Sequence, residues 1–188
     1  MNYDILLNIA KQAILHHLNI PKSLDRDELL KTYPFLEKNG ASFVTLNKDG
    51  SLRGCIGSII AHQSLFDDIY KNATLAAFGD PRFDPLSVDE LELISIEVSL
   101  LSEPKQLIYK NYDDLVAKLE PFKDGVILKH NYHQGTFLPQ VWEQLPTTKE
   151  FLDHLAQKAG ATPAIYKQNP TIYTYQVTSK ERGFHEIL

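Results

Sequence analysis

The sequence predicts an α+β fold in which a mixed or antiparallel sheet is flanked by helices. Between Ile5 and Leu18, apolar residues repeat at helical spacing. Residues 41–58 instead alternate with a period of two on either side of a turn at 47–50, which is a hairpin signal. Residues 94–101 alternate in the same way and form the clearest strand of the chain. These three patterns together indicate helices packed on a sheet.

The composition is that of an ordinary globular protein, and it argues against several classes of protein. Of the 188 residues, 43% are hydrophobic and 23% are charged. The net charge of −5 argues against broad nucleic-acid binding, because phosphate contacts need a basic surface. The N-terminal residues have no basic segment before an apolar run, and no apolar run reaches the length of a membrane span. We expect a protein without signal peptide or membrane segment.

Cysteine usage narrows the class further. Cys55 is the only cysteine, which excludes an intrachain disulfide and any multi-cysteine metal or iron–sulfur site. A lone thiol is typical of a reducing compartment, so we expect a cytoplasmic protein. Since the spacing His130-x-x-His133 lacks a third ligand, we expect neither a metal nor another cofactor.

The first half of the chain is predicted to place helical segments around these strands. In chain order they are a helix that Asn2 caps and Pro21 ends, a helical turn at 25–30, a helix at 64–78 that ends at Gly79, and a short helix behind a Ser87–Glu90 capping box. The hairpin between them allows two registers. A loop over 48–50 places Leu46 opposite Leu52, which gathers the aliphatic side chains on one face; a shift by one residue mixes the faces.

We choose the first register, which assigns Val44, Leu46, Leu52 and Ile56 to the buried face. The opposite face then carries Phe43, Thr45, Arg53 and Cys55 together. The central expectation is that Arg53 and Cys55 project side by side from one open strand face.

The remaining third is predicted to form a second lobe, with boundaries of roughly 1–105 and 106–188. Its expected elements are a helix at 112–119, strands at 125–129 and 136–138, a short helix from Pro139, a helix at 149–159 and a final strand at 171–179. No disordered linker separates the lobes, so close packing is expected.

Several motifs occur in a specific order. They read "LRGCIGS" at 52–58, "DPRF" at 80–83, "IEVSLLS" at 96–102 and "GTFLPQVWEQLP" at 135–146, with "FLDHLAQKAG" at 151–160. Together they resemble the AMMECR domain family, called protein A of the AmmeMemoRadiSam system. Asp84 stands where that family typically has a second proline.

The resemblance implies an α+β fold with a larger and a smaller subdomain meeting at a cleft that the RGCIG strand faces. It also implies gene association with a Memo-like protein and a radical-SAM protein, as possible partners. It does not assign a reaction.

Cys55 is the first candidate for chemistry. A lone strand cysteine is usually a small buried hydrophobe. A neighbouring Arg53 favours the thiolate form, which is the nucleophile. Gly54 and Gly57 leave room for another backbone or a ligand, so we include both with Arg53 as substrate-binding candidates.

A nucleophilic cysteine needs a base. Glu97, the charged residue of the best strand, is either solvated between serines or a general base at the cleft. His133 follows a strand near the "GTFLPQ" motif and is the alternative base, although most surface histidines have no role.

Arg82 in the rigid "DPRF" loop is the stronger anion-binding candidate; its structural alternative is a salt bridge with Asp80 or Asp84. Thr136 and Gln140 are polar groups that could orient a ligand at the subdomain junction. Three functions follow: an enzyme acting on a small anionic substrate through Cys55, a binding module with the same residues, or an adaptor for the partner proteins.

Overall fold

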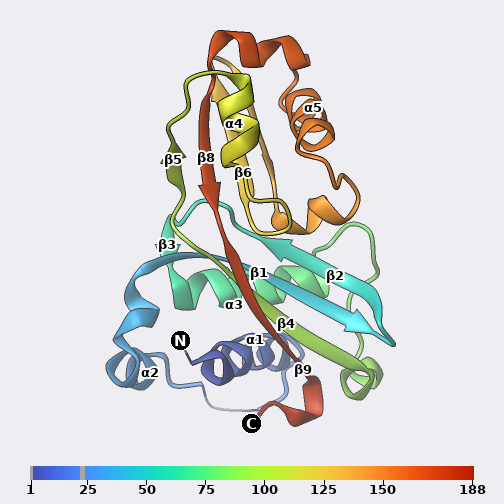
Figure 1. Cartoon of the computed structure of the whole chain (residues 1–188). Coiled ribbons are helices and arrows are strands. Elements are labelled where there is room, and N and C mark those ends of the chain that lie inside the picture. The colour runs from blue at the N-terminus through green and yellow to red at the C-terminus, as the bar shows by residue number, and fades with distance from the viewer. Residues whose placement is uncertain (1, 22–23) are drawn as a thin grey trace. The chain divides into compact units, whose positions relative to one another are not determined.

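The computed structural model describes residues 2–21 and 24–188, and this part of the chain forms two compact units (Figure 1). Unit 1 runs up to Leu101 and includes Thr178–Leu188; unit 2 is Ser102–Val177. Both units combine an antiparallel sheet with helices, so the predicted α+β class is confirmed.

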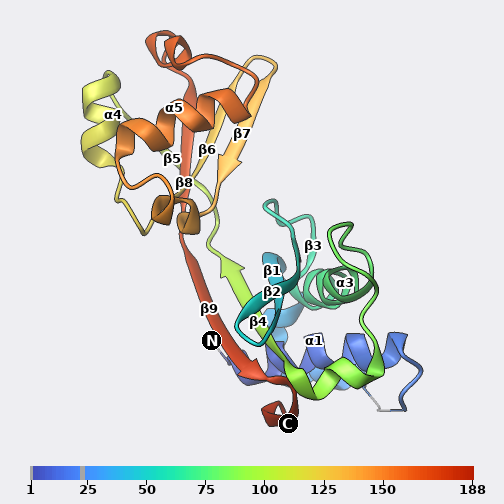
Figure 2. The same cartoon turned by 90° about the vertical axis from the view of Figure 1, so that its right-hand side faces the viewer.

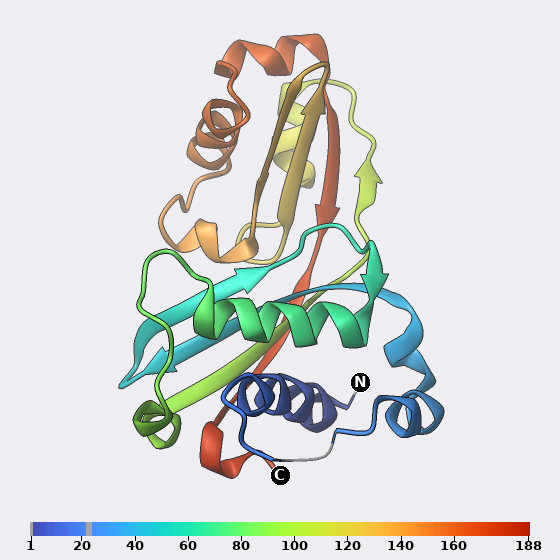
Figure 3. The ribbon, with the colours of Figure 1, turned by 180° about the vertical axis from the view of Figure 1, so that it is seen from behind.

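The sheet of unit 1 has the strand order β2-β1-β4-β9. Its strands are β1 (Asn39–Lys48), β2 (Ser51–Gly57), β4 (Ile94–Leu101) and β9 (Val177–Gly183), and the short β3 (Gln63–Ser64) pairs with the start of β1. Helices α1 (Tyr3–His17) and α3 (Leu65–Phe78) pack against each other and against one face of this sheet (Figure 3). Shorter segments complete the unit: α2 (Arg26–Thr32) and the 3-10 helices η1 (Pro34–Glu37), η2 (Val88–Leu93) and η5 (Phe184–Glu186).

The helices of unit 1 begin where the sequence predicts. The Asn2 side chain accepts a hydrogen bond from the backbone of Asp4, and Ser64 caps α3 through the backbone of Asp67. Apolar residues at helical spacing on both helices are buried against Val44, Leu46, Ile96 and Val98 of the sheet. Within the described residues, no helix combines the length and the apolar character that crossing a membrane requires.

The predicted register of the β1–β2 hairpin is wrong. Asp49 and Gly50, with φ of 51° and 75°, form a two-residue turn, so Lys48 lies opposite Ser51. A bulge at Arg53 then shifts the register, and Leu46 pairs with Gly54. The bulge preserves the buried face through Gly54 and Ile56, whereas Leu52 leaves the core and is 43% exposed.

Unit 2 is built on a sheet of strand order β5-β8-β6-β7 (Figure 2). The strands are β5 (Lys105–Leu107), β6 (Gly125–His130), β7 (His133–Phe137) and β8 (Thr171–Tyr175); the helices are α4 (Tyr112–Lys118), α5 (Thr148–Lys158), η3 (Pro139–Glu143) and η4 (Pro163–Gln168). Trp142 is fully buried, stacks on Phe151 at a centroid distance of 3.7 Å, and donates its indole N–H to the Asp124 carbonyl.

The predicted second lobe differs from unit 2 at both ends. Unit 2 begins at Ser102 rather than near 106. The single strand expected at 171–179 is two strands, β8 and β9, interrupted at Gln176. After this break the chain returns to unit 1, where β9 joins the sheet beside β4. An alternating pattern alone could not show that one extended segment serves two sheets.

Candidate functional site

The free edge of β2 is covered by the loop that follows α3. Because β2 is the first strand in its sheet, its outward backbone groups have no strand partner. Asp80 accepts a hydrogen bond from the Cys55 backbone N–H at 2.9 Å, and Arg82 Nη2 donates to the Cys55 carbonyl at 3.2 Å. The "DPRF" loop therefore satisfies both main-chain groups of Cys55.

Asp80 and Arg82 form one fixed unit within this loop. Arg82 Nε and Nη2 donate to the two oxygens of Asp80 at 2.9 and 2.6 Å. Asp80 is 4% exposed, and the Arg82 guanidinium, together with the backbone N–H groups of Cys55 and Arg82, holds the pKa of its carboxyl far below the usual range. The hydrogen bond to Asp80 in turn raises the pKa of Arg82. The Arg82 side chain remains 53% exposed, so one flank of the guanidinium faces solvent.

Cys55 lies in a row of polar side chains that crosses three strands. Thr45 of β1 pairs with Cys55 of β2 on one side and with Glu97 of β4 on the other. The Thr45 hydroxyl donates to the Cys55 sulfur at 3.2 Å, and the Ser99 hydroxyl donates to Glu97 at 2.9 Å. Since successive side chains alternate between faces, this row lies on the sheet face opposite α1 and α3. The cysteine is partly accessible there.

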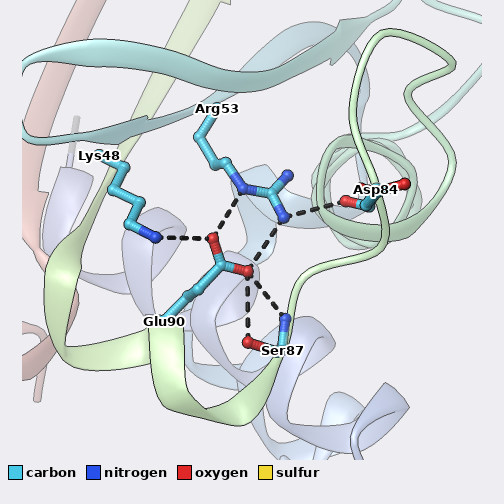
Figure 4. Close-up of polar contacts among 5 residues, drawn as sticks. All are labelled: Lys48, Arg53, Asp84, Ser87 and Glu90. Carbon is cyan, nitrogen blue, oxygen red and sulfur yellow. Dashed lines mark hydrogen bonds and ion pairs between the residues drawn. The ribbon is translucent and has the colours of Figure 1, made fainter.

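Arg53 does not share this site, which corrects the central sequence expectation. Its Nε and Nη2 donate to the two oxygens of Glu90 at 2.9 and 3.0 Å, and Nη2 also donates to the Asp84 carbonyl at 2.9 Å (Figure 4). Lys48 donates to the same carboxylate at 3.1 Å. Arg82, rather than Arg53, is the arginine that contacts Cys55.

The Arg53 cluster links the hairpin to η2 (Figure 4). The Arg53 side chain is 13% exposed, and its Nη1 is covered and has no hydrogen-bond partner in the described part of the chain. Arg53, the Ser87 backbone and Lys48 lower the pKa of Glu90 to about 2. The physical cause of the missed arrangement is the bulge, because a bulge redirects the side chain of its extra residue.

The two glycines beside Cys55 are explained by packing. A Cβ on Gly54 would lie 2.1 Å from the Ala76 carbonyl oxygen of α3, and one on Gly57 would lie 2.2 Å from the Phe43 ring. Gly54 therefore lets the helix backbone approach the sheet, and Gly57 makes room for an aromatic side chain. No ligand is needed to account for either residue.

The other candidates, His133, Thr136 and Gln140, belong to unit 2. His133 pairs with His130 at the end of the β6–β7 hairpin, and its Nδ1 lies 3.1 Å from the Ala159 carbonyl. Thr136 Oγ1 lies 3.3 Å from the Tyr175 hydroxyl, and Gln140 is exposed in η3. Within residues 2–21 and 24–188, no group of three or more His, Cys, Asp or Glu side chains is placed to hold a metal.

The sequence predicts no site role for Thr45 and Asp80, which contact Cys55, or for Glu90, which holds Arg53 away from it. Thr45 was placed on the correct face, but its contact with the sulfur depends on the true register. The sequence predicts Asp80 only as a salt-bridge partner of Arg82 and Glu90 only as part of a capping box, whereas Asp80 also accepts from the Cys55 backbone and Glu90 from Arg53. The signal for Asp80 was its position two residues before an arginine, since an aspartate there can bind both backbone and guanidinium.

Fold and site together define an α+β protein whose cysteine-bearing edge strand is held by an Asp–Arg loop. The chain belongs to the AMMECR1 family, which matches residues 7–180, so the resemblance seen in the sequence is confirmed.

Relatives of the chain occur in several archaea. It is 39% identical to a protein of Methanopyrus kandleri over 168 residues, 85% of this chain and 78% of that one. It is 36% identical to a protein of Methanothermobacter thermautotrophicus over 187 residues, covering 96% and 92%. The crystal structure of an uncharacterized protein from Pyrococcus horikoshii has the same fold, with a TM-score of 0.77, 29% identity and coverage of 95% and 90%. Family membership therefore assigns the fold and no activity.

Proposed function

We propose that this protein is an enzyme or an enzyme-accessory protein that binds a small anionic substrate beside Cys55. The observation that carries the proposal is the position of Arg82. Its guanidinium is anchored by Asp80, contacts the backbone of the cysteine, and is half exposed. A cation held in this way needs no rearrangement to bind an anion, which favours affinity. Of the two arginines expected to hold the anion, Arg53 and Arg82, the proposal keeps Arg82.

The reactive group in this proposal is the Cys55 thiol, acting as nucleophile or as proton donor. Thr45 holds the sulfur through its hydroxyl. Glu97 lies two strands away, about 10 Å by the usual strand spacing, so it cannot take the thiol proton directly. A substrate lying over Thr45 would reach both Cys55 and Glu97. We assign Glu97 to proton transfer with the substrate.

One observation favours the alternative of a binding module without reaction. Among the hydrogen bonds of the described residues, the Cys55 sulfur is joined to Thr45 and to no histidine or carboxylate. A thiol without an adjacent base is a weaker nucleophile than one with such a partner. The same surface would then hold an anionic ligand through Arg82 and leave it unchanged.

Alkylation of the single cysteine tests the proposed anion binding. Iodoacetate and iodoacetamide react with the same thiolate, but only iodoacetate is attracted by Arg82. Arg82→Gln should lower the ratio of the iodoacetate rate to the iodoacetamide rate about fivefold, because one unit charge near 4 Å contributes ~1 kcal/mol in water. Arg182→Gln is the matched control, since Arg182 of β9 binds Asp4 of α1 and does not contact Cys55. The ratio is measured by intact-protein mass spectrometry.

An unchanged ratio in Arg82→Gln would contradict the anion site and leave the adaptor function, with Memo-like and radical-SAM proteins as the partners to test by co-purification. If the ratio falls as expected, anionic metabolites are screened for protection of Cys55 from alkylation. Those that protect it are incubated with the wild-type chain and with Cys55→Ser. Conversion by the wild-type chain alone supports an enzyme. Protection without conversion supports the binding module.

A further inference from the structure

A cavity of about 710 Å³ opens in unit 2 between the start of α4, the first turns of α5, and η4. Three lysines line it: Lys110, two residues before α4, Lys149 of α5 and Lys167 of η4. The lining also includes two tyrosines, one aspartate and two asparagines: Tyr112, Tyr166, Asp153, Asn111 and Asn169. The cavity shares none of its lining with the residues assigned to the Cys55 site.

The lysines of this cavity form no close ion pair among the described residues. Unit 2 has eight lysines, no arginine and eight aspartates or glutamates between Ser102 and Val177. Lys118 and Lys123 pair with carboxylates at 2.9 and 2.7 Å. In the described part of unit 2, Lys110, Lys149 and Lys167 have no ion pair. Three lysines against one carboxylate, Asp153, leave the lining of the cavity with a net positive charge, although the whole chain carries a net charge of −5.

The cavity also has a fixed apolar wall. Tyr166 is 3% exposed and its hydroxyl donates to the Leu152 carbonyl at 2.6 Å, so its ring is held in place. The ring of Tyr112 lies 5.6 Å from it, measured between centroids. Pro163 and Ala164 add further apolar surface. Such a wall suits the organic body of a ligand, whereas an inorganic ion alone would leave it uncovered.

Asp153 adds a hydrogen-bond acceptor to this cationic and apolar lining. It has no ion pair within the described residues of unit 2, although it lies four residues after Lys149 on α5. Burial, followed by the charges of Asp153 and Asp113, raises the pKa of Tyr112, which places the Asp153 carboxylate close to that ring. A carboxylate at this position accepts from a hydroxyl or amine group of a ligand.

We propose that unit 2 binds a small phosphate ester in this cavity, with the phosphate between the three lysines and the organic body against Tyr112 and Tyr166. Asp153 would accept a hydrogen bond from a hydroxyl or amine of that body. This is a second site, which goes beyond the anion site proposed at Cys55 and stands on different residues. A phosphate ester is favoured because it combines charge with an apolar body in one molecule.

Titration of the isotope-labelled full chain with AMP, adenosine and inorganic phosphate tests the proposal by NMR. AMP should shift the amide signals of residues 110–112, 149–153 and 164–169. Adenosine, which lacks the phosphate, and inorganic phosphate, which lacks the organic body, should each bind at least about tenfold more weakly. The double variant Lys149→Gln/Lys167→Gln should bind AMP at least about tenfold more weakly, while Lys105→Gln/Lys123→Gln, outside the cavity, should bind as the wild type does.

Equal binding of AMP and adenosine would overturn the phosphate site, and equal binding of AMP and inorganic phosphate would overturn the role of the tyrosine wall. AMP affinity that survives the loss of Lys149 and Lys167, or shifts confined to other residues, would overturn the placement. Failure of all three probes at millimolar concentration would overturn the proposal as a whole. The substituted lysines are exposed, so unchanged amide spectra of the free variants will show that the fold is retained.

Discussion

Units 1 and 2 use their positive charges in opposite ways. In unit 1, Arg26, Arg53 and Arg82 each bind a carboxylate at 2.6 to 3.0 Å, and these pairs join segments that are distant in sequence or secure a loop. Unit 2 contains no arginine, and the lysines around its cavity lack carboxylate partners among the described residues. An arginine beside a promising motif can therefore be structural, whereas lysines with no motif can mark the more open binding surface.

The units also differ in how closely their backbones approach. In unit 1, Gly54 brings β2 against the Ala76 carbonyl of α3; in unit 2, Gly125 lies against the Tyr175 ring instead. A carbonyl within a helix cannot move without disturbing the helix, whereas a ring can shift. The two glycines therefore provide a direct comparison of the stability of each unit.

The largest expected effect follows from this difference. Gly54→Ala should destabilise unit 1 by about 4 kcal/mol, above the ~1–3 kcal/mol usual for an overpacked core, because its Cβ meets backbone. Gly125→Ala should cost about 2 kcal/mol in unit 2, since the obstacle is a side chain. Hydrogen exchange of amides in β1 and β6 reports the two units separately. Equal losses for the two variants would contradict the backbone argument.

The next prediction compares an ion pair from each unit. Arg53→Gln should destabilise unit 1 by about 3 kcal/mol, because it leaves the Glu90 carboxylate largely covered without its main partner. Lys118→Gln removes an exposed pair with Asp114 in unit 2 and should cost less than about 0.5 kcal/mol. Denaturant unfolding followed by exchange of β4 and β6 amides measures both. An Arg53 effect as small as that of Lys118 would show that its cluster is dispensable.

Low pH should destabilise unit 1 more than unit 2, by less than Arg53→Gln does. The pKa of Glu90 is lowered from 4.5 to about 2, chiefly by Arg53, so the stability it confers is complete above pH 4.5 and is lost as pH falls toward 2. Between about pH 6 and pH 3 this amounts to about 2 kcal/mol. Pepsin at about pH 3 should therefore cleave unit 1 before unit 2. Glu90→Gln should make the stability of unit 1 less dependent on pH, and an unaltered pH dependence would refute the assignment.

Much of the fold could be predicted because it depends on local patterns. The cap at Asn2, the helix predicted at 64–78 and the alternation of 94–101 are determined by nearby residues, and the structure confirms them. The hairpin register was not predictable in this way. Position 54 excludes a Cβ because the Ala76 carbonyl of α3 lies against it, and the partner of Arg53 lies 37 residues away. Long-range contacts of this kind leave no periodic signal in the sequence.

In the candidate site too, local features could be predicted and long-range contacts could not. Cys55 and Arg82 were recognised from residue type and local context, and the structure joins them through the Cys55 carbonyl. The role of Arg53 was inferred from strand alternation alone, which the bulge invalidates. The sequence contains no motif that indicates the lysine cavity, because its three lysines lie in separate segments between residues 110 and 167.

The return of the chain to unit 1 has a consequence for how the protein can change. Unit 2 is spliced between β4 and β9, which are neighbours in one sheet, and at its ends the Ser102 N–H donates to the Gln176 carbonyl at 2.8 Å. A cassette whose two ends meet can be exchanged or shortened without reordering the host strands. A tight turn from Leu101 to Thr178 would connect β4 directly to β9. The surface around Cys55 could then be studied, or could evolve, without unit 2.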